Sequence, residues 1–86
     1  MYRVVLQSQA RRFFADADRP LARKLARAFR VLEQNPRGHP NIKPLSGDLA
    51  GLFRFRAGAH RVIYSVDEGT RSVHVLLIAH RRDAYR

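Results

Sequence analysis

The side chains with the clearest chemical potential are three arginines in the second half of the chain. Arg54 and Arg56 alternate with Phe53 and Phe55, and Arg61 follows after a short turn sequence. Alternate residues of a β-strand point to opposite faces, so the arginines fall on one face and the phenylalanines on the other. Because a guanidinium can bind two phosphate oxygens at once, this pattern predicts a phosphate-binding surface on a β-hairpin.

The register of this hairpin decides whether the three arginines meet. A two-residue loop at 57–58 pairs Arg56 with Ala59 and Arg54 with Arg61, whereas a slip of one residue would turn arginines into the core. The predicted buried face then holds Phe53, Phe55, Val62 and Tyr64. The opposite face, here named the arginine face, carries Arg54, Arg56 and Arg61. Like charges opposite each other are unfavourable, and such a conflict is typical of a functional site; the plainer alternative is a solvated basic strand.

The C-terminal residues add histidine, arginine and tyrosine side chains. A histidine titrates near neutral pH, and a tyrosine beside arginines suits stacking on an unpaired base, which makes His80 and Tyr85 candidates. By strict alternation His80, rather than Arg81, points to the arginine face, although we expect this strand to end near residue 79. His60 falls on the core side near the turn, where we expect a hydrogen-bonded structural histidine.

Other familiar chemistries are not indicated by the sequence. No pair of histidines has metal-ligand spacing and the chain has no cysteine, so we expect no metal site. The glycine-containing stretch 47–58 matches neither a P-loop nor a dinucleotide-binding motif, and the carboxylates are few and scattered. We therefore expect no cofactor.

The elements that must position these residues follow from hydrophobic periodicity. Leu21, Leu25, Ala28, Phe29 and Leu32 make one apolar stripe on a helix. The predicted order is a strand at 2–7, helices at 9–17 and about 19–35, a loop at 37–51, and strands at 52–56, 59–66 and 72–79. The expected fold class is α+β: an N-terminal strand, an antiparallel helical hairpin, then three antiparallel strands forming one twisted sheet. All of this fits a single domain over residues 1–86.

The composition is strongly basic. Seventeen lysines and arginines face seven acidic residues, for a formal net charge of +10. Such a charge repels itself in a small domain, so it predicts a polyanionic partner such as nucleic acid, an acidic protein or an anionic membrane. The absence of cysteine, of a signal-peptide pattern and of a long apolar run predicts a cytoplasmic protein that does not enter a membrane.

Three sequence segments together resemble a known family. They read KPLSGDLAGLFRFR at 43–56, GAHRVIY at 58–64 and IAHRRDAY at 78–85. The pattern resembles the RelE/ParE superfamily of bacterial toxins from type II toxin–antitoxin systems, with the RelE branch favoured. The resemblance implies an antiparallel sheet packed on a helical hairpin, and an acidic antitoxin that neutralises the toxin. It also implies operator DNA binding only through the antitoxin complex, and a ribosome-dependent endoribonuclease that cleaves messenger RNA.

The resemblance also implies roles for single residues. Arg54 and Arg56 match a basic pair that, with Lys43, contacts RNA phosphates, and Arg61 matches the arginine that holds the scissile phosphate. Arg81 matches a proposed general acid, and the tyrosine that stacks on the substrate base corresponds to Tyr85. The best-known RelE carries lysines where this chain has Arg54 and Arg56, and an arginine cannot serve as a base at ordinary pH. His80 is then a candidate acid or base, and His60 a weaker one.

Two rival functions share the same fold. One is a ParE-like inhibitor of DNA gyrase, against which the retained Arg61, Arg81 and Tyr85 argue. The other is a catalytically weak member that mainly binds antitoxin and operator DNA. Cleaved messages after induction of the protein would separate the nuclease from both.

Overall fold

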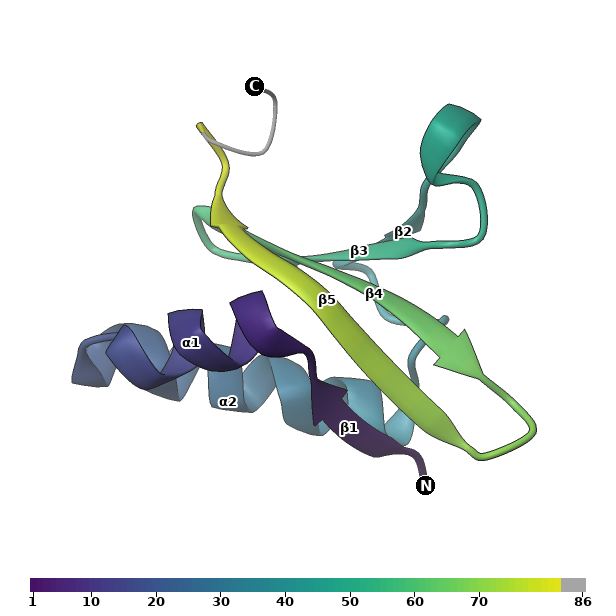
Figure 1. Cartoon of the computed structure of the whole chain (residues 1–86), viewed down its shortest axis with the longest axis horizontal. Helices are drawn as coiled ribbons and strands as arrows, with labels where there is room; N and C mark the ends of the chain where they lie inside the picture. Colours follow the sequence, from purple (N-terminus) through teal and green to yellow (C-terminus); the bar gives the residue numbers. More distant parts are fainter. Residues whose placement is uncertain (83–86) are drawn as a thin grey trace.

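The computed structural model describes residues 1–82 and shows two helices packed on one mixed β-sheet (Figure 1). The elements are β1 (Arg3–Leu6), α1 (Ser8–Asp16), α2 (Arg19–Gln34), β2 (Ile42–Pro44), the 3-10 turn η1 (Gly47–Leu49), β3 (Phe53–Ala57), β4 (His60–Asp67) and β5 (Ser72–His80). The strand order is β1-β5-β4-β3-β2; β1 runs parallel to β5, and the other neighbours are antiparallel. The predicted α+β class is confirmed.

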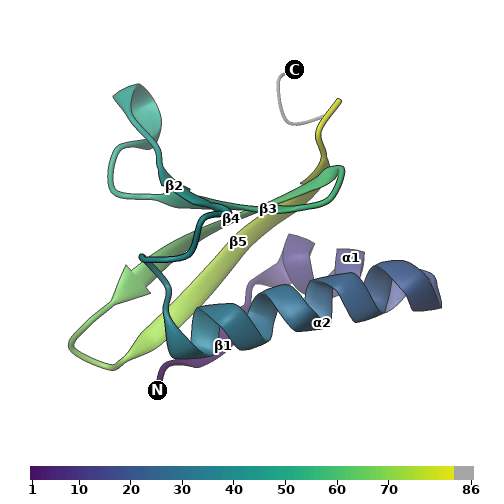
Figure 2. The same ribbon diagram turned by 180° about the vertical axis from the view of Figure 1, so that it is seen from behind.

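Both helices cover the same face of the sheet and leave the other face open (Figures 1 and 2). The predicted apolar stripe on α2 is the reason, since Leu25, Ala28 and Leu32 are fully or almost fully buried against the strands. Phe14 of α1 meets Phe29 of α2 edge to face, with ring centroids 5.4 Å apart. Asp18 caps α2, because its Oδ1 accepts a hydrogen bond from the backbone N–H of Leu21 at 3.0 Å. No helix within residues 1–82 has the length and apolar character needed to cross a membrane.

The core lies between the helices and the inner side of β3, β4 and β5. Phe55, Val62 and Tyr64 are buried as the face assignment predicted, and they are joined by Val73, Val75 and Ile78. Each such side chain contributes roughly 1.5–3 kcal/mol when fully buried. The buried hydroxyl of Tyr64 donates a hydrogen bond to the carbonyl oxygen of Pro36 at 2.7 Å, and burial raises the pKa of this phenol. The bond holds the start of the segment that leads from α2 to β2.

One strand lies where the sequence predicted only a loop. Ile42 to Pro44 pairs with β3, so that Ile42 faces Phe55, Lys43 faces Arg54 and Pro44 faces Phe53. The loop prediction for 37–51 is wrong at these positions. The strand is only three residues long and ends in a proline, a residue that is typical of turns and loops. A proline is tolerated here because β2 is an edge strand.

The hairpin between β3 and β4 has a different register from the predicted one. Arg56 pairs with Arg61 and Arg54 with Ile63, so the loop is Gly58 and Ala59 instead of residues 57–58. Gly58 has φ +62°, which suits the first position of a type II′ hairpin turn. Because the pairing shifted by two residues, each side chain still points to the face that was predicted for it.

A β-bulge in β5 reverses the alternation near the C-terminal end of the strand. Tyr64 pairs with Val75 and Ile63 pairs with Leu77, which leaves Leu76 as an extra residue. Leu76 and Leu77 are both partly exposed, at 37% and 39%, while Ile78 is buried. His80 pairs with His60 on the helix side of the sheet, so the prediction that His80 points to the arginine face is wrong.

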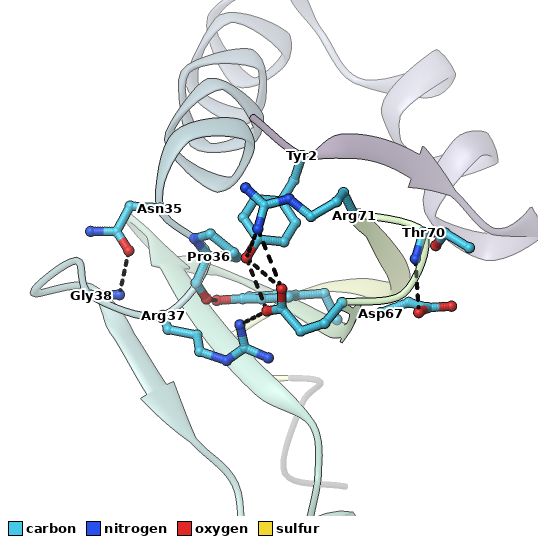
Figure 3. Close-up of polar contacts among 10 residues, drawn as sticks. Tyr2, Asn35, Pro36, Arg37, Gly38, Asp67, Thr70 and Arg71 are labelled. Carbon is cyan, nitrogen blue, oxygen red and sulfur yellow. Dashed lines mark hydrogen bonds and ion pairs between the residues drawn. The ribbon is translucent and has the colours of Figure 1, made fainter.

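A polar cluster fixes the end of the sheet away from the β3–β4 turn (Figure 3). Glu68, in the turn between β4 and β5, accepts hydrogen bonds from the hydroxyl of Tyr2 and from Arg37, and pairs with Arg71 at 3.5 Å. The hydrogen bond from Arg37 is the main reason that the pKa of Glu68 is lowered and that of Arg37 is raised. The cluster therefore ties the start of β1 and the segment after α2 to one turn.

Candidate phosphate-binding site

The arginine face lies on the open side of the sheet. Arg54 and Arg56 of β3 and Arg61 of β4 point away from the helices, and Lys43 of β2 lies directly opposite Arg54. Four cationic side chains from three neighbouring strands therefore share one surface. Figure 1 shows this surface as the side of the sheet that neither helix covers.

Two neighbouring hollows on the surface are lined by these cations. The first has a volume of about 160 Å³ and is lined by Arg56, Gly58, His60, Arg61 and Arg81. The second has a volume of about 290 Å³ and is lined by Pro40, Asn41, Ile42, Lys43, Arg54 and Arg56. Arg56 belongs to both, so a chain of phosphates lying along the face would meet one cation after another.

The position of Arg81 follows from a backbone contact beyond the end of β5. Its N–H donates to the carbonyl oxygen of Ala59 in the hairpin turn at 2.7 Å. This contact carries Arg81 to the hollow that Arg56 and Arg61 line. His80, by contrast, is not among the residues that line this hollow. Of the two C-terminal candidates within residues 1–82, Arg81 is the one that joins the arginine face.

The arginine face is electrostatically unfavourable in isolation. Arg56 and Arg61 are directly opposite each other across β3 and β4, and like charges in this position cost roughly 0.2–1 kcal/mol. Arg56 is exposed to solvent, whereas Arg61 is half-buried. A like-charged pair of this kind is typical of a surface kept for binding, and a phosphate anion would offset the repulsion between the two arginines.

His60 was predicted to be a hydrogen-bonded structural histidine, and the structure differs from this prediction. Within residues 1–82, its Nδ1 is buried and has no hydrogen-bond partner. Its ring lies edge-on to Phe13, at 5.7 Å between centroids, and to His80, at 5.2 Å. Burial, followed by the charges of His80 and Lys24, lowers the pKa of His60. The sequence placed it correctly on the core side, but the packing of the ring left one nitrogen without a partner.

Tyr85, the last of the predicted site residues, lies outside the described residues, so its stacking role stays a prediction. No group of three or more histidine, cysteine or acidic side chains within residues 1–82 is arranged to hold a metal ion.

Sequence reasoning missed the contribution of Pro40 and Asn41 to the second hollow. The signal that could have found it is the alternation of Ile42, Lys43 and Pro44, which matches the face pattern of β3.

The fold and the open basic face together define a small α+β protein whose helix-free sheet surface suits a polyanion. Residues 4–85 match the family model described as the ParE toxin of the type II toxin–antitoxin system parDE. The chain belongs to this toxin family.

Curated relatives and solved structures agree with this assignment. The chain is 43% identical over 58 residues to "Toxin RelE" and 43% identical over 44 residues to "Toxin RelG", both of Mycobacterium tuberculosis. These matches cover 67% and 51% of this chain, and they span 58% and 51% of the two relatives.

The similarity to solved structures extends over nearly the whole chain. The toxin–antitoxin complex RelBE2 of M. tuberculosis contains a chain that is 34% identical, with a TM-score of 0.77 and coverage of 93% of this chain and 98% of that one. A chain of the RelE–RelB complex of Pyrococcus horikoshii is 27% identical, with a TM-score of 0.79 and coverage of 93% and 94%.

Proposed function

We propose that this protein is the toxin of a toxin–antitoxin pair and acts as an endoribonuclease that cleaves messenger RNA on the ribosome. The observation that carries this proposal is the convergence of Arg56, Arg61 and Arg81 on one hollow, continued by Arg54 and Lys43 along the open sheet face. A hollow of about 160 Å³ lined by three guanidinium groups suits one phosphate group of an RNA strand. The fold of the chain and its family membership support the same reading.

The proposed reaction is an internal transfer at phosphorus. The ribose 2′-oxygen forms a bond to the adjacent phosphorus while the bond from phosphorus to the 5′-oxygen of the next nucleotide breaks. The 2′-hydroxyl loses its proton to a base, and the leaving 5′-oxygen gains a proton from an acid. The products are a 2′,3′-cyclic phosphate and a free 5′-hydroxyl.

The residues take roles that their chemistry permits. Arg56 and Arg61 would stabilise the negative charge that builds on the phosphate oxygens, which is usually the largest single contribution to such catalysis. Arg81 lines the same hollow and would protonate the leaving oxygen, the role for which His80 was the alternative. None of the arginines can serve as the base, because an arginine stays protonated at any physiological pH. Ribosomal positioning of the 2′-hydroxyl would lessen the need for a strong base.

The expected partners follow from charge and from the relatives. A net charge of +10 favours an acidic antitoxin that covers the basic surface. The two structural relatives named above come from complexes of a toxin with an antitoxin. We propose a cognate acidic antitoxin, the ribosome with its message as target, and operator DNA bound only through the antitoxin complex. These partners imply a cytoplasmic location.

The proposal is tested by inducing the protein without its antitoxin and mapping message ends by primer extension. The wild-type chain should produce cuts in phase with codons. Arg61→Ala should reduce cleavage by about 10²–10³-fold, because it removes a group that stabilises the transition state. Arg23→Ala is the matched control, since Arg23 is an exposed arginine on α2 and should cut as wild type does. Undiminished cleavage by Arg61→Ala would reject the site.

A second candidate function is inhibition of DNA gyrase, which the ParE description of the matching family model favours. Induction would then cause DNA damage while messages remain intact. A chain that is harmless when induced alone would instead indicate a catalytically weak member that mainly binds antitoxin and operator DNA. The same primer-extension experiment separates these outcomes from the nuclease.

A further inference from the structure

The last residue of β5 and the residue after it are held by the hairpin between β3 and β4. The backbone N–H of Arg81 donates to the carbonyl oxygen of Ala59 at 2.7 Å. The ring of His80 stands edge-on to the ring of His60, with centroids 5.2 Å apart and planes at 86°. The backbone N–H of Arg82 donates to Nδ1 of His80 at 3.2 Å. The segment that carries Arg81 is therefore attached to β4 through Ala59 and His60.

His60 lies at the centre of this arrangement. Its other side packs edge-on against Phe13 of α1, and its Nδ1 is buried with no hydrogen-bond partner within residues 1–82. Lys24 of α2 lies close by, against the same hairpin turn: a Cβ placed on Gly58 would be 2.7 Å from its Nζ. Arg56, Arg61 and Arg81 line the hollow that His60 also lines. The ring is thus surrounded mainly by apolar and cationic groups.

We propose that His60 is a positioning residue whose uncharged ring holds His80 and thereby places Arg81 in the hollow with Arg56 and Arg61, and that protonation of His60 releases this segment. In this view Arg81 acts on the RNA, and His60 acts only through His80. The inference rests on the proposed function for its consequence in catalysis, but the physical coupling between His60 and Arg81 stands without it.

The electrostatic surroundings support the sensitivity to protons. Burial is the largest effect that lowers the pKa of His60, and the charges of His80 and Lys24 lower it further, while Asp18 at the N-terminus of α2 raises it. Arg56, Arg61 and Arg81 are the other charged residues that line the hollow beside the ring. These effects favour the uncharged ring, and a proton added on acidification meets burial and the charges of His80 on β5 and Lys24 on α2.

The experiment is a pH titration of the isolated, ¹⁵N-labelled protein by NMR between pH 7.5 and 5. It follows the ring signals of His60 and the amide signal of Arg81. In the wild-type chain, the Arg81 amide should shift with the midpoint of the His60 ring, below the ordinary value of about 6.5. His60→Phe keeps an aromatic ring that does not titrate, so the part of the Arg81 amide shift that follows the His60 midpoint should disappear. His80→Phe removes the neighbouring charge, so the midpoint of His60 should move upward.

The outcomes separate this inference from the proposed function. An Arg81 amide that titrates unchanged in His60→Phe, or that stays still while His60 titrates, would overturn the coupling between His60 and Arg81. Neither result depends on any RNA. Where message cleavage is observed, the ratio of wild-type to His60→Phe cleavage should fall about tenfold one pH unit below the His60 midpoint, because about nine tenths of the rings are then protonated. A constant ratio would overturn the catalytic consequence alone. Unfolding temperatures at pH 7.5 check that both variants are folded.

Discussion

At the scale of single residues, one buried hydrogen bond connects the core to the segment that carries part of the site. Tyr64 is fully buried between the helices and the sheet, stacks on Phe53 at 5.6 Å between ring centroids, and donates its hydroxyl proton to the carbonyl oxygen of Pro36. Pro36 begins the segment that leads to β2 and its Lys43. One core side chain therefore fixes the start of the path to the second hollow.

Removing this hydroxyl tests that connection. Tyr64→Phe keeps the ring but leaves the Pro36 carbonyl without its partner, so the free energy of unfolding should fall by about 1–3 kcal/mol. Tyr2→Phe is the matched control, because the hydroxyl of Tyr2 bonds to Glu68 at an exposed site and its loss should cost less than about 1 kcal/mol. Denaturant unfolding of both variants gives the comparison. Equal losses of unfolding free energy in the two variants would mean that burial of the Tyr64 hydroxyl does not strengthen its contribution to stability.

At the scale of elements, the bulge in β5 decides which side chains face the helices. Strict alternation would bury Leu77 and expose Ile78, whereas the structure buries Ile78 completely and leaves Leu77 at 39% exposure. Ile78→Ala should therefore lower the free energy of unfolding by about 2–5 kcal/mol, because it leaves a cavity in the core. Leu77→Ala should cost less than about 1 kcal/mol. Thermal or denaturant unfolding of this adjacent pair checks the register, and the reverse order of losses would place the bulge elsewhere.

The strands β3, β4 and β5 show which features the sequence could predict and which it could not. The face assignment of β3 and β4 was recoverable because Phe55 and Arg56 are so different that only one face can be the core. The exact pairing was not, because a shift of two residues leaves every face unchanged. The bulge left no signal, since Leu76 and Leu77 are both apolar and suit either side. The position of His80 was therefore predicted wrongly, and the hollow containing Arg81 required the structure.

The edge strands β1 and β2 also depend on long-range pairing that their own sequences do not reveal. β1 was predicted from the alternation of Tyr2, Val4 and Leu6, but its parallel pairing with β5 depends on the path of the helices between them. β2 is too short to produce a pattern of its own, and its existence depends on the partner groups that β3 offers. Long-range pairing of this kind is set by the whole sheet and not by any local segment.

At the scale of the whole molecule, the basic residues are divided between two opposite sides. The arginine face lies on the open side of the sheet, while Arg19, Arg23, Arg27 and Arg30 are exposed on α2, which lies on the covered side (Figure 1). The two sides meet at one edge, where Lys24 and Arg27 of α2 line a hollow together with Arg56. The net charge of +10 attracts RNA from any direction, but only the residues that touch phosphates should release counterions on binding.

This division predicts how binding depends on salt. Each phosphate contact to a single strand contributes about −0.7 to the slope of log K against log salt concentration, so contacts from Lys43, Arg54, Arg56, Arg61 and Arg81 together give about −3.5. Arg56→Gln should weaken the slope by about 0.7, since Arg56 lines both hollows. Arg23→Gln removes the same charge from the helix side and should leave the slope nearly unchanged. Fluorescence anisotropy of a labelled single-stranded RNA at several salt concentrations measures both, and equal changes in the two variants would mean that the RNA does not distinguish the open face from the helices.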